Sequence, residues 1–178
     1  MIRILPWLLL ALGTTMSAHA TPPDDGLLYP RIARFGGVAD IGAHPAAEPE
    51  RMRRLLFDLD MGGGDGLHPG LEAVARLLNL YALAGIPNER VEVVVLLRGK
   101  ATSLALRADA FAARSGQPHR NTGLRDALLD AGVHFEVCGQ ALHRNGYTAG
   151  EVDPRIAVAL GAVLRRETLL AQGYVLAR

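Results

Sequence analysis

The amino-acid sequence predicts an α/β fold, a three-layer sandwich around a four- or five-stranded, mainly parallel sheet. From residue 54 onward, short apolar segments typical of strands alternate with longer segments in which apolar residues recur at helical spacing. Residues 91–97, VEVVVLL, are the clearest strand, because they are rich in valine and almost continuously apolar, as in a strand covered on both faces. Since parallel strands are joined by long crossovers, this alternation predicts βαβ units.

The first predicted strand covers residues 54–60 and leads into a glycine-rich turn at 61–68. Pro69 suits the first position of a helix, where its missing N–H and fixed φ are both tolerated. Gly85 is expected to end this helix before the strand at 91–97 begins. The apolar face of the helix comprises Leu71, Val74, Ala75, Leu78 and Ala82.

The middle of the chain predicts two more helices and another strand. Gly99 ends the central strand, and residues 101–115 have the composition of a helix. Asn121 is a candidate N-cap for the next helix, which is expected to reach Gly132. Residues 133–137 then alternate between polar and apolar side chains, as a strand does.

The C-terminal part decides the number of strands. Residues 138–146 predict a short helical turn, and residues 156–160 fit either a fourth strand or the start of the last helix. That helix is expected over residues 162–172, and a final short strand over residues 174–176. The sheet is therefore expected to have four or five strands.

The N-terminus predicts export. Residues 1–20 combine one basic residue, a short apolar stretch and the sequence Ala18-His19-Ala20, which are the three parts of a cleavable secretory signal peptide. The apolar stretch is shorter than the ~20 residues of a membrane-spanning helix. We therefore expect cleavage near Ala20, a periplasmic or secreted protein, and no membrane association after cleavage.

Two further segments follow the signal peptide. Residues 21–53 are rich in proline, glycine and charge without a stable period, and they predict an extended arm with a short pairing around residues 34–41. Residues 54–178 are expected to form one α/β domain.

The charge balance argues against nucleic-acid binding. Removal of the signal peptide leaves 18 of the 19 basic residues, against 18 acidic residues. Proteins that bind nucleic acids usually carry a basic surface, because phosphate contacts dominate their affinity. We therefore expect no nucleic-acid partner.

We expect neither a metal nor an organic cofactor. The segment Gly62-Gly63-Gly64-Asp65-Gly66 lacks the third glycine of the dinucleotide-binding fingerprint, and Asp65 would oppose a bound anion. The histidines form no H-x-H or H-x-x-x-H pair, and Cys138 and His143 would point apart on a helix.

Cys138 is the lone cysteine, so no disulfide can form within the chain. It lies where a predicted strand passes into a helical turn, and the positive end of a helix dipole favours a reactive thiolate. A small side chain that fills a tight corner beside Gly139 is the alternative. Both readings of Cys138, reactive and structural, remain open at this point.

Ligands in parallel α/β folds bind beyond the carboxyl ends of the strands. We expect Asp58 and Asp60 to lie on opposite faces of the first strand, so that they do not share a proton. The candidate pocket residues at these strand ends are Asp60, His68, Arg98, Gly99, Gly139, Gln140, His143 and Arg144.

Four segments carry a family resemblance: LNLYALAG at 78–85, VVVLLRG at 93–99, AGVHFEVCGQ at 131–140 and LAQGY at 170–174. From about Arg54 to Arg178 the chain resembles the exported branch of the DsrE/DsrF-like family. The resemblance implies a five-stranded parallel α/β fold and a homo-oligomer, a trimer or hexamer. In sulfur-relay members a cysteine at the position of Cys138 accepts persulfide sulfur and passes it on.

This sequence departs from the family at two places. It has Arg98-Gly99 where the family often has His-Gly, and Asn145-Gly146 where it often has Arg-Gly. Arg98 and Arg144 can supply positive charge near the cysteine instead.

The resemblance and the placement of Cys138 favour a sulfur carrier or sulfurtransferase that exchanges sulfur with a donor or acceptor protein. The alternative is a non-enzymatic oligomeric module that binds a small ligand or a protein and keeps Cys138 for structure.

Overall fold

The computed structural model describes residues 24–42, 45–46 and 48–177, so the predicted signal peptide lies outside the described residues. Within them, five strands form one sheet in the order β4-β3-β2-β1-β5, and every adjacent pair is parallel. This confirms the predicted parallel sheet with its upper strand number. The strands are β1 (Arg53–Leu59), β2 (Val91–Leu97), β3 (His134–Cys138), β4 (Ala157–Ala159) and β5 (Val175–Ala177).

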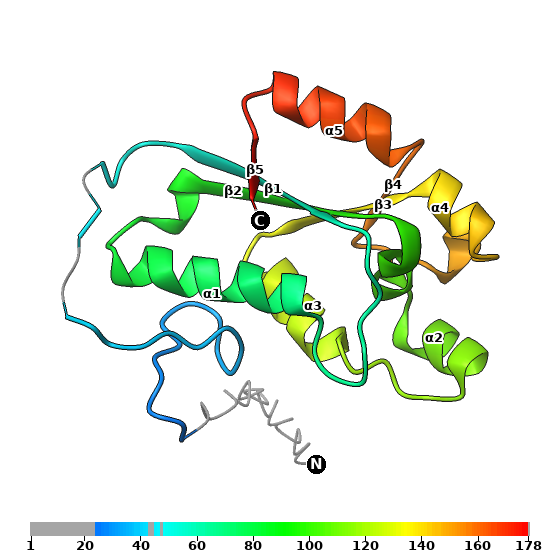
Figure 1. The fold of residues 1–178 in the computed structure, drawn as a ribbon, viewed down its shortest axis with the longest axis horizontal. Coiled ribbons are helices and arrows are strands. Elements are labelled where there is room, and N and C mark those ends of the chain that lie inside the picture. Colours follow the sequence, from blue (N-terminus) through cyan, green and yellow to red (C-terminus); the bar gives the residue numbers. More distant parts are fainter. Residues whose placement is uncertain (1–23, 43–44, 47, 178) are drawn as a thin grey trace, which may run out of the picture.

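Helices cover both faces of the sheet, which confirms the three-layer sandwich (Figure 1). Helices α1 (Pro69–Leu83) and α3 (Thr122–Asp130) lie on one face, and α5 (Ala162–Ala171) lies on the other. The short helices α2 (Ala108–Ser115) and α4 (Gly139–Arg144) lie toward the end of the sheet where β1 to β3 finish. None of the described helices has the length and apolarity to cross a membrane.

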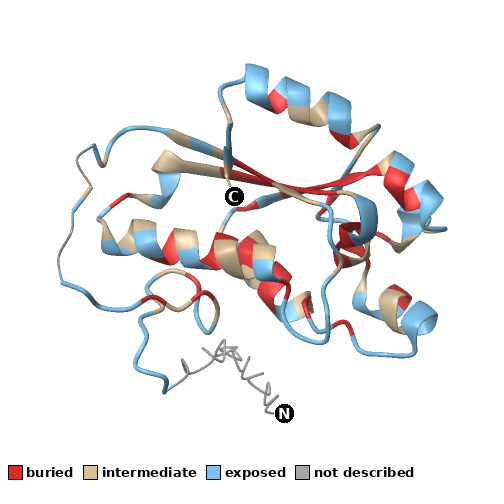
Figure 2. Cartoon of the chain, in the orientation of Figure 1, coloured by how far each residue is buried: buried red, intermediate tan, exposed pale blue. Residues whose placement is uncertain are grey.

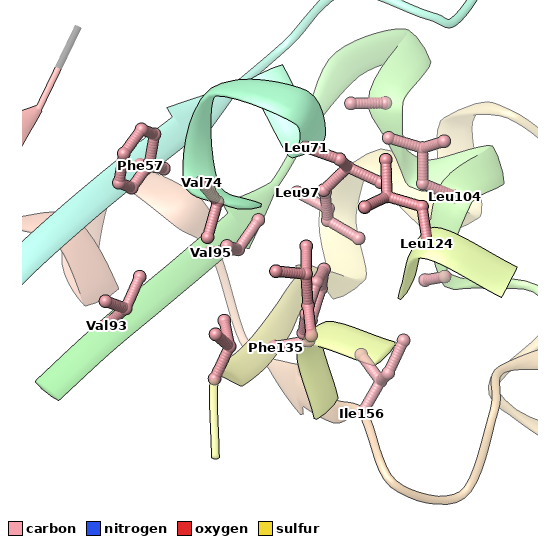
Figure 3. Close-up of a cluster of buried hydrophobic side chains, with 14 of the residues drawn as sticks. Phe57, Leu71, Val74, Val93, Val95, Leu97, Leu104, Leu124, Phe135 and Ile156 are labelled. Carbon is pink, nitrogen blue, oxygen red and sulfur yellow. The ribbon is translucent and has the colours of Figure 1, made fainter. Parts of the chain in front are cut away.

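The central strand β2 contributes to a separate core on each face of the sheet. Val93, Val95 and Leu97 belong to the larger cluster, which packs against α1 and α3 (Figure 3). Val94 and Leu96 belong to a smaller cluster that includes residues of α4 and α5. The strand is accordingly buried along most of its length (Figure 2), as its continuous apolar sequence predicts.

The predicted helix over residues 101–115 is wrong in its first half. Gly99–Ala105 form a 3-10 helix, and α2 starts only at Ala108. Between them the chain pairs with a distant segment: Leu106 bridges Val152, and the Arg107 N–H donates to the Glu151 carbonyl. Tertiary pairing thus replaces the helical hydrogen bonds that the composition favours.

A buried ion pair reinforces the same region. Arg125 of α3 is 1% exposed, and it donates to the carbonyl oxygens of Leu104 and Leu106. Its Nη2 also donates to the Asp153 carboxylate at 2.9 Å. The guanidinium therefore ties α3 to the chain before α2 and to the turn before β4.

Two predictions, a fourth strand at residues 156–160 and an N-cap at Asn121, have different outcomes. Residues 157–159 are a strand, so the fourth-strand alternative for residues 156–160 is confirmed. Asn121 precedes α3 but makes no side-chain cap hydrogen bond to it. Its side-chain oxygen instead accepts a hydrogen bond from the His68 N–H at 2.7 Å, which joins the start of α3 to the start of α1.

Part of the segment before β1 is held against α1. Leu28 and Val38 form an isolated antiparallel bridge, so the pairing expected within residues 34–41 is made by Val38, and its partner is Leu28. Arg31 and Ile32 lie between these two residues, and their N–H groups donate to the side-chain oxygen of Asn79, a buried residue of α1. The same side chain donates to the carbonyls of Phe35 and Gly36. One amide of α1 therefore anchors residues 28–38, the blue loop beside α1 in Figure 1.

Candidate functional site

A cavity of about 630 Å³ opens at the carboxyl end of β3, between α4 and the chain that enters α5. Leu97 of β2 pairs with Val137 of β3, which pairs with Val158 of β4, so these strands finish at the same edge of the sheet. The cavity lies beyond this edge, where ligands of parallel α/β folds bind. It is lined by Arg98, Gly99, Cys138, Gln140, Ala141, Arg144, Asn145, Leu160, Gly161, Ala162, Val163 and Leu164.

Cys138 forms part of the wall of this cavity. It is the last residue of β3 and the N-cap of α4, and it is 6% exposed. Its neighbours in the smaller core include Leu96, Ala141 and Ala162. The thiol is thus packed on its inner side and borders open space on the other.

The hydrogen-bond donor to the cysteine comes from α5. The Ala162 N–H donates to Cys138 Sγ at 3.3 Å. Ala162 is the first residue of α5, and no side chain caps this end of the helix. An N–H group at a helix N-terminus stabilises negative charge on the atom that it faces. The sequence predicted that the helix following Cys138 would stabilise its thiolate, whereas in the structure the N–H that donates to the sulfur belongs to α5.

Arg98 is held beside the cavity by two carboxylates. Its Nε donates to Asp58 Oδ1 at 2.7 Å, and its Nη1 lies 3.1 Å from Asp60 Oδ2. Asp58 Oδ2 also accepts from Arg166 of α5 at 3.1 Å. Asp58 and Asp60 therefore face the same guanidinium, and the expectation that they lie on opposite faces is wrong. Side chains two residues apart in an extended chain point to the same side.

The electrostatic environment keeps Arg98 protonated. Burial alone lowers the pKa of Arg98, but hydrogen bonds and charge from Asp58 and Asp60 outweigh it and raise the pKa above its usual value. Because the Asp58 side chain is only 6% exposed and is shared with Arg166, it fixes both guanidinium groups on this side of the sheet.

The backbone at the end of β2 requires glycine. Gly99 has φ +53, a left-handed conformation that other residues rarely adopt. A Cβ at this position would also lie 2.8 Å from the carbonyl oxygen of Asp60. Gly99 therefore lets the chain after β2 pass close to the chain after β1, which brings Arg98 within reach of both aspartates.

Asn145 links α4 to this turn. Its Nδ2 donates to the Gly99 carbonyl at 2.8 Å and to the Thr102 hydroxyl at 2.9 Å. The neighbouring Arg144 is exposed and, among the described residues, makes no ion pair with a carboxylate. Among the residues that the structure describes, Arg98 and Arg144 are the only charged ones that line the cavity, so its described lining is cationic.

The structure brings together five of the residues predicted for the site: Arg98, Gly99, Cys138, Gln140 and Arg144 all line the cavity. Asp60 is connected to it through Arg98, and Gly139 begins α4 directly after the cysteine. His143 is exposed on α4 and does not line the cavity.

His68 is not part of this cavity. It is buried as the N-cap of α1, where its Nδ1 accepts from the Gly70 N–H at 3.1 Å. Its Nε2 lies 3.0 Å from the Met61 carbonyl and, since Nδ1 accepts, donates to it. The imidazole therefore closes the glycine-rich turn, and the predicted grouping of His68 with Arg98 and Gln140 in one pocket is not what the structure contains.

Several residues of the site were not foreseen from the sequence: Asp58 as the partner of Arg98, Arg166, Asn145 and residues 160–164. A signal for the last group was present, because a fourth parallel strand at 156–160 would end at the same edge as the strand before Cys138. Within the described residues, no three His, Cys, Asp or Glu side chains are grouped closely enough to hold a metal ion.

Comparison with known proteins identifies the fold. No family model and no curated protein matches the chain. Among solved structures, it is similar to MTH1491, a protein of unknown function from Methanobacterium thermoautotrophicum, with 18% identity and a TM-score of 0.50 over 71% of this chain and 98% of that one. It is also similar to the YchN protein of E. coli, with 11% identity and a TM-score of 0.49 over 70% and 97% of the two chains. The likeness to MTH1491, together with the five-stranded parallel sheet, shows that the chain has the DsrE-like α/β fold that its sequence resemblance implies.

Proposed function

We propose that this protein is a sulfur carrier or sulfurtransferase in which Cys138 accepts sulfur as a persulfide. The observation that carries the proposal is the position of the thiol: it borders a cavity of about 630 Å³ and receives a hydrogen bond from the first N–H of α5. A cysteine kept only for packing has no need of an adjoining cavity or of a helix N-terminus.

The transfer needs no external oxidant. After the thiol proton is lost to solvent, the Cys138 thiolate attacks the outer sulfur of a donor persulfide. The donor S–S bond breaks, its electron pair leaves with the donor thiolate, and a new S–S bond forms on Cys138. An acceptor thiolate then removes the sulfur by the same step in reverse. The thiolate is the reactive form in each step.

The surrounding residues fit this chemistry. Donor persulfides and leaving thiolates are anions, and Arg98 and Arg144 are the charged residues of the cavity. The Ala162 N–H donates to the sulfur on which charge is held before attack. Asp58 and Asp60 keep Arg98 in place and do not themselves line the cavity.

The test is persulfide formation on the mature chain. The protein is incubated with polysulfide or thiosulfate and its intact mass is measured. We expect a gain of one sulfur that a reductant removes and that Cys138→Ser lacks. If neither donor forms an adduct with the folded protein while both react with the unfolded chain, the result contradicts the proposal and supports a binding module with a structural cysteine.

We also propose that the protein is exported, on the basis of the signal-peptide features of residues 1–20. Expression of the full-length chain in a bacterium with a periplasm, followed by fractionation and intact-mass measurement, tests this. The expected product is periplasmic and starts at Thr21, and a product retaining Met1 in the cytoplasm would contradict the proposal.

Assembly into a homo-oligomer, a trimer or hexamer, is proposed as well. Support comes from the two edges of the sheet, where large apolar side chains are exposed: Val158 on β4, and Val175 and Leu176 on β5. Edge strands with exposed apolar side chains tend to be covered by another chain. Light scattering on the mature protein gives the mass in solution, and a monomer at micromolar concentration would rule this out.

A further inference from the structure

We infer that the cavity beside Cys138 selects an organic sulfur donor, a small monoanion with an apolar stem, over an inorganic sulfur anion. The inference rests on the proposed function, since it names the class of molecule that would deliver sulfur to Cys138. It is drawn from three features that meet in one cavity: an exposed apolar wall, an uncompensated positive charge and a volume that suits an organic molecule.

The apolar wall consists of Leu160, Val163 and Leu164. These side chains are 74%, 71% and 56% exposed, yet all three line the cavity that contains Cys138. Burying apolar surface is favourable by about 25 cal/mol per Å². An inorganic anion cannot bury these side chains, whereas an alkyl or aryl stem can lie against them while its sulfur reaches the thiol.

The charge of the cavity fits one negative charge on the ligand. Asp58 and Asp60 offset Arg98 and Arg166, and neither aspartate lines the cavity. Arg144 lines the cavity without a carboxylate partner among the described residues. The charges of these five side chains therefore add up to one positive charge, which Arg144 carries.

The volume points the same way. Cavities that bind small organic molecules typically measure ~300–1,000 Å³. The cavity beside Cys138 measures about 630 Å³. An inorganic sulfur anion of a few atoms would leave most of this space to water, so it would gain little from the shape of the site.

A second copy of the chain is the rival occupant of the apolar wall. A symmetric contact over the cavity would bring Arg144 of each copy toward the same small region, which like charges disfavour. The sheet edges also offer exposed apolar side chains elsewhere, at Val158, Val175 and Leu176. The observations therefore favour a small anion in the cavity, and the experiment includes the rival as an outcome.

The experiment compares alkyl thiosulfonates that share one reacting group and differ in stem length: methane-, butane- and hexanethiosulfonate. In each case the Cys138 thiolate attacks the terminal sulfur, the donor S–S bond breaks with its electron pair on the sulfinate, and the persulfide sulfur stays on Cys138. The second-order rate constant of persulfide formation is measured by mass spectrometry. Full burial of a methylene group corresponds to about a fourfold gain. Because the wall is open to solvent and would bury the five additional methylene groups only in part, we expect hexanethiosulfonate to react roughly tens-fold faster than methanethiosulfonate.

Two variants test where the stem binds. The double variant Leu160→Ser/Leu164→Ser is expected to remove most of the dependence on stem length, so that the ratio of the hexanethiosulfonate rate constant to the methanethiosulfonate rate constant falls toward one. Leu170→Ser is the matched control, because Leu170 is 44% exposed on the same helix as Leu164 and does not line the cavity. Arg144→Gln is expected to slow all three donors by a similar factor.

Calorimetry of hexanesulfonate binding to Cys138→Ser separates the inference from the proposed function, because a sulfonate cannot transfer sulfur. Measurable binding that Leu160→Ser/Leu164→Ser abolishes supports the inference even if no donor forms a persulfide, an outcome that would overturn the proposed function alone. Persulfide formation at rates independent of stem length would overturn the inference alone. A loss of oligomer mass in the double variant with unchanged sulfonate affinity would assign the wall to a second copy and overturn the inference as well.

Discussion

The Ala162 N–H donates to Cys138 Sγ at 3.3 Å, although the two residues are 24 positions apart in the chain. The contact joins the end of β3 to the beginning of α5, and both residues line the cavity. We therefore expect the reactivity of Cys138 to depend on the position of α5, the long helix on that face of the sheet (Figure 1).

Replacing Ala162 by proline tests this contact. Proline is tolerated at the first position of a helix, and the preceding Gly161 has the extended conformation that proline requires (φ −164, ψ 139). The substitution therefore removes the N–H donor while α5 is kept. A hydrogen bond to a charged group is worth about 1.5–3 kcal/mol, and the variant's thiolate loses this bond. We therefore expect iodoacetamide to label Cys138 of the variant at neutral pH at least about ten times more slowly than it labels the wild type.

Ala162→Ser is the control, since it changes the side chain and retains the N–H. Thermal unfolding of both variants reports whether α5 still packs. Labelling of Ala162→Pro at the wild-type rate, with an unchanged melting temperature, would show that the donor has no influence on the thiol.

Asp58 and Asp60 both contact Arg98 but differ in burial, which predicts different costs of removal. The Asp58 side chain is 6% exposed and serves two arginines, whereas that of Asp60 is 48% exposed. We expect Asp58→Asn to lower the free energy of unfolding by about 1–3 kcal/mol and Asp60→Asn by less than about 1 kcal/mol. Urea denaturation at neutral pH measures both, and equal effects would contradict the assignment of Asp58 as the anchor.

The fold was accessible from the sequence because local signals agreed with it. The apolar run of β2 predicted a strand buried on both faces, and Pro69 and Gly85 marked the two ends of α1 closely. Cys138 was correctly placed between β3 and a short helix. Each of these signals lies within a few residues of the element that it specifies.

The contacts that build the site were not accessible, since they join distant segments. The hydrogen-bond donor to the Cys138 sulfur lies on α5. His68, which its place in the chain grouped with Arg98, instead uses its ring nitrogens in hydrogen bonds with Met61 and Gly70. The break between the 3-10 helix at Gly99–Ala105 and α2 likewise coincides with the pairing of Leu106 with Val152. Composition alone favoured a helix there, and tertiary contacts decided otherwise.

Asp153 predicts an acid-sensitive contribution to stability. Hydrogen bonds from Arg155, together with the charge of buried Arg125, lower the pKa of Asp153 from 3.8 to about 2. Because the folded-state pKa is depressed, this contribution is fully present above pH ~4 and is lost as the pH falls toward ~2. The shift corresponds to roughly 2 kcal/mol. Urea denaturation should show that the stability gap between the wild type and Asp153→Asn narrows by about this amount between pH 5 and pH 2, and a constant gap would contradict the prediction.

Asn79 predicts the cost of detaching the segment before β1. Its side chain is fully buried and makes hydrogen bonds to Arg31, Ile32, Phe35 and Gly36, while Ile32 packs into the larger core. Asn79→Leu would leave these backbone groups without partners, each at a cost of about 1–3 kcal/mol if it remained buried. We expect the segment to detach instead, because it contributes few apolar side chains to the fold: buried Ile32 and Val38, and partly buried Phe35. Limited proteolysis should then cut within residues 28–38 at least tenfold faster, while hydrogen exchange in β2 stays slow.

Asn88→Leu is the matched control, since Asn88 makes one exposed hydrogen bond to the Ala131 carbonyl. Slow cleavage of Asn79→Leu would show that Ile32 and Val38 hold the segment without the amide.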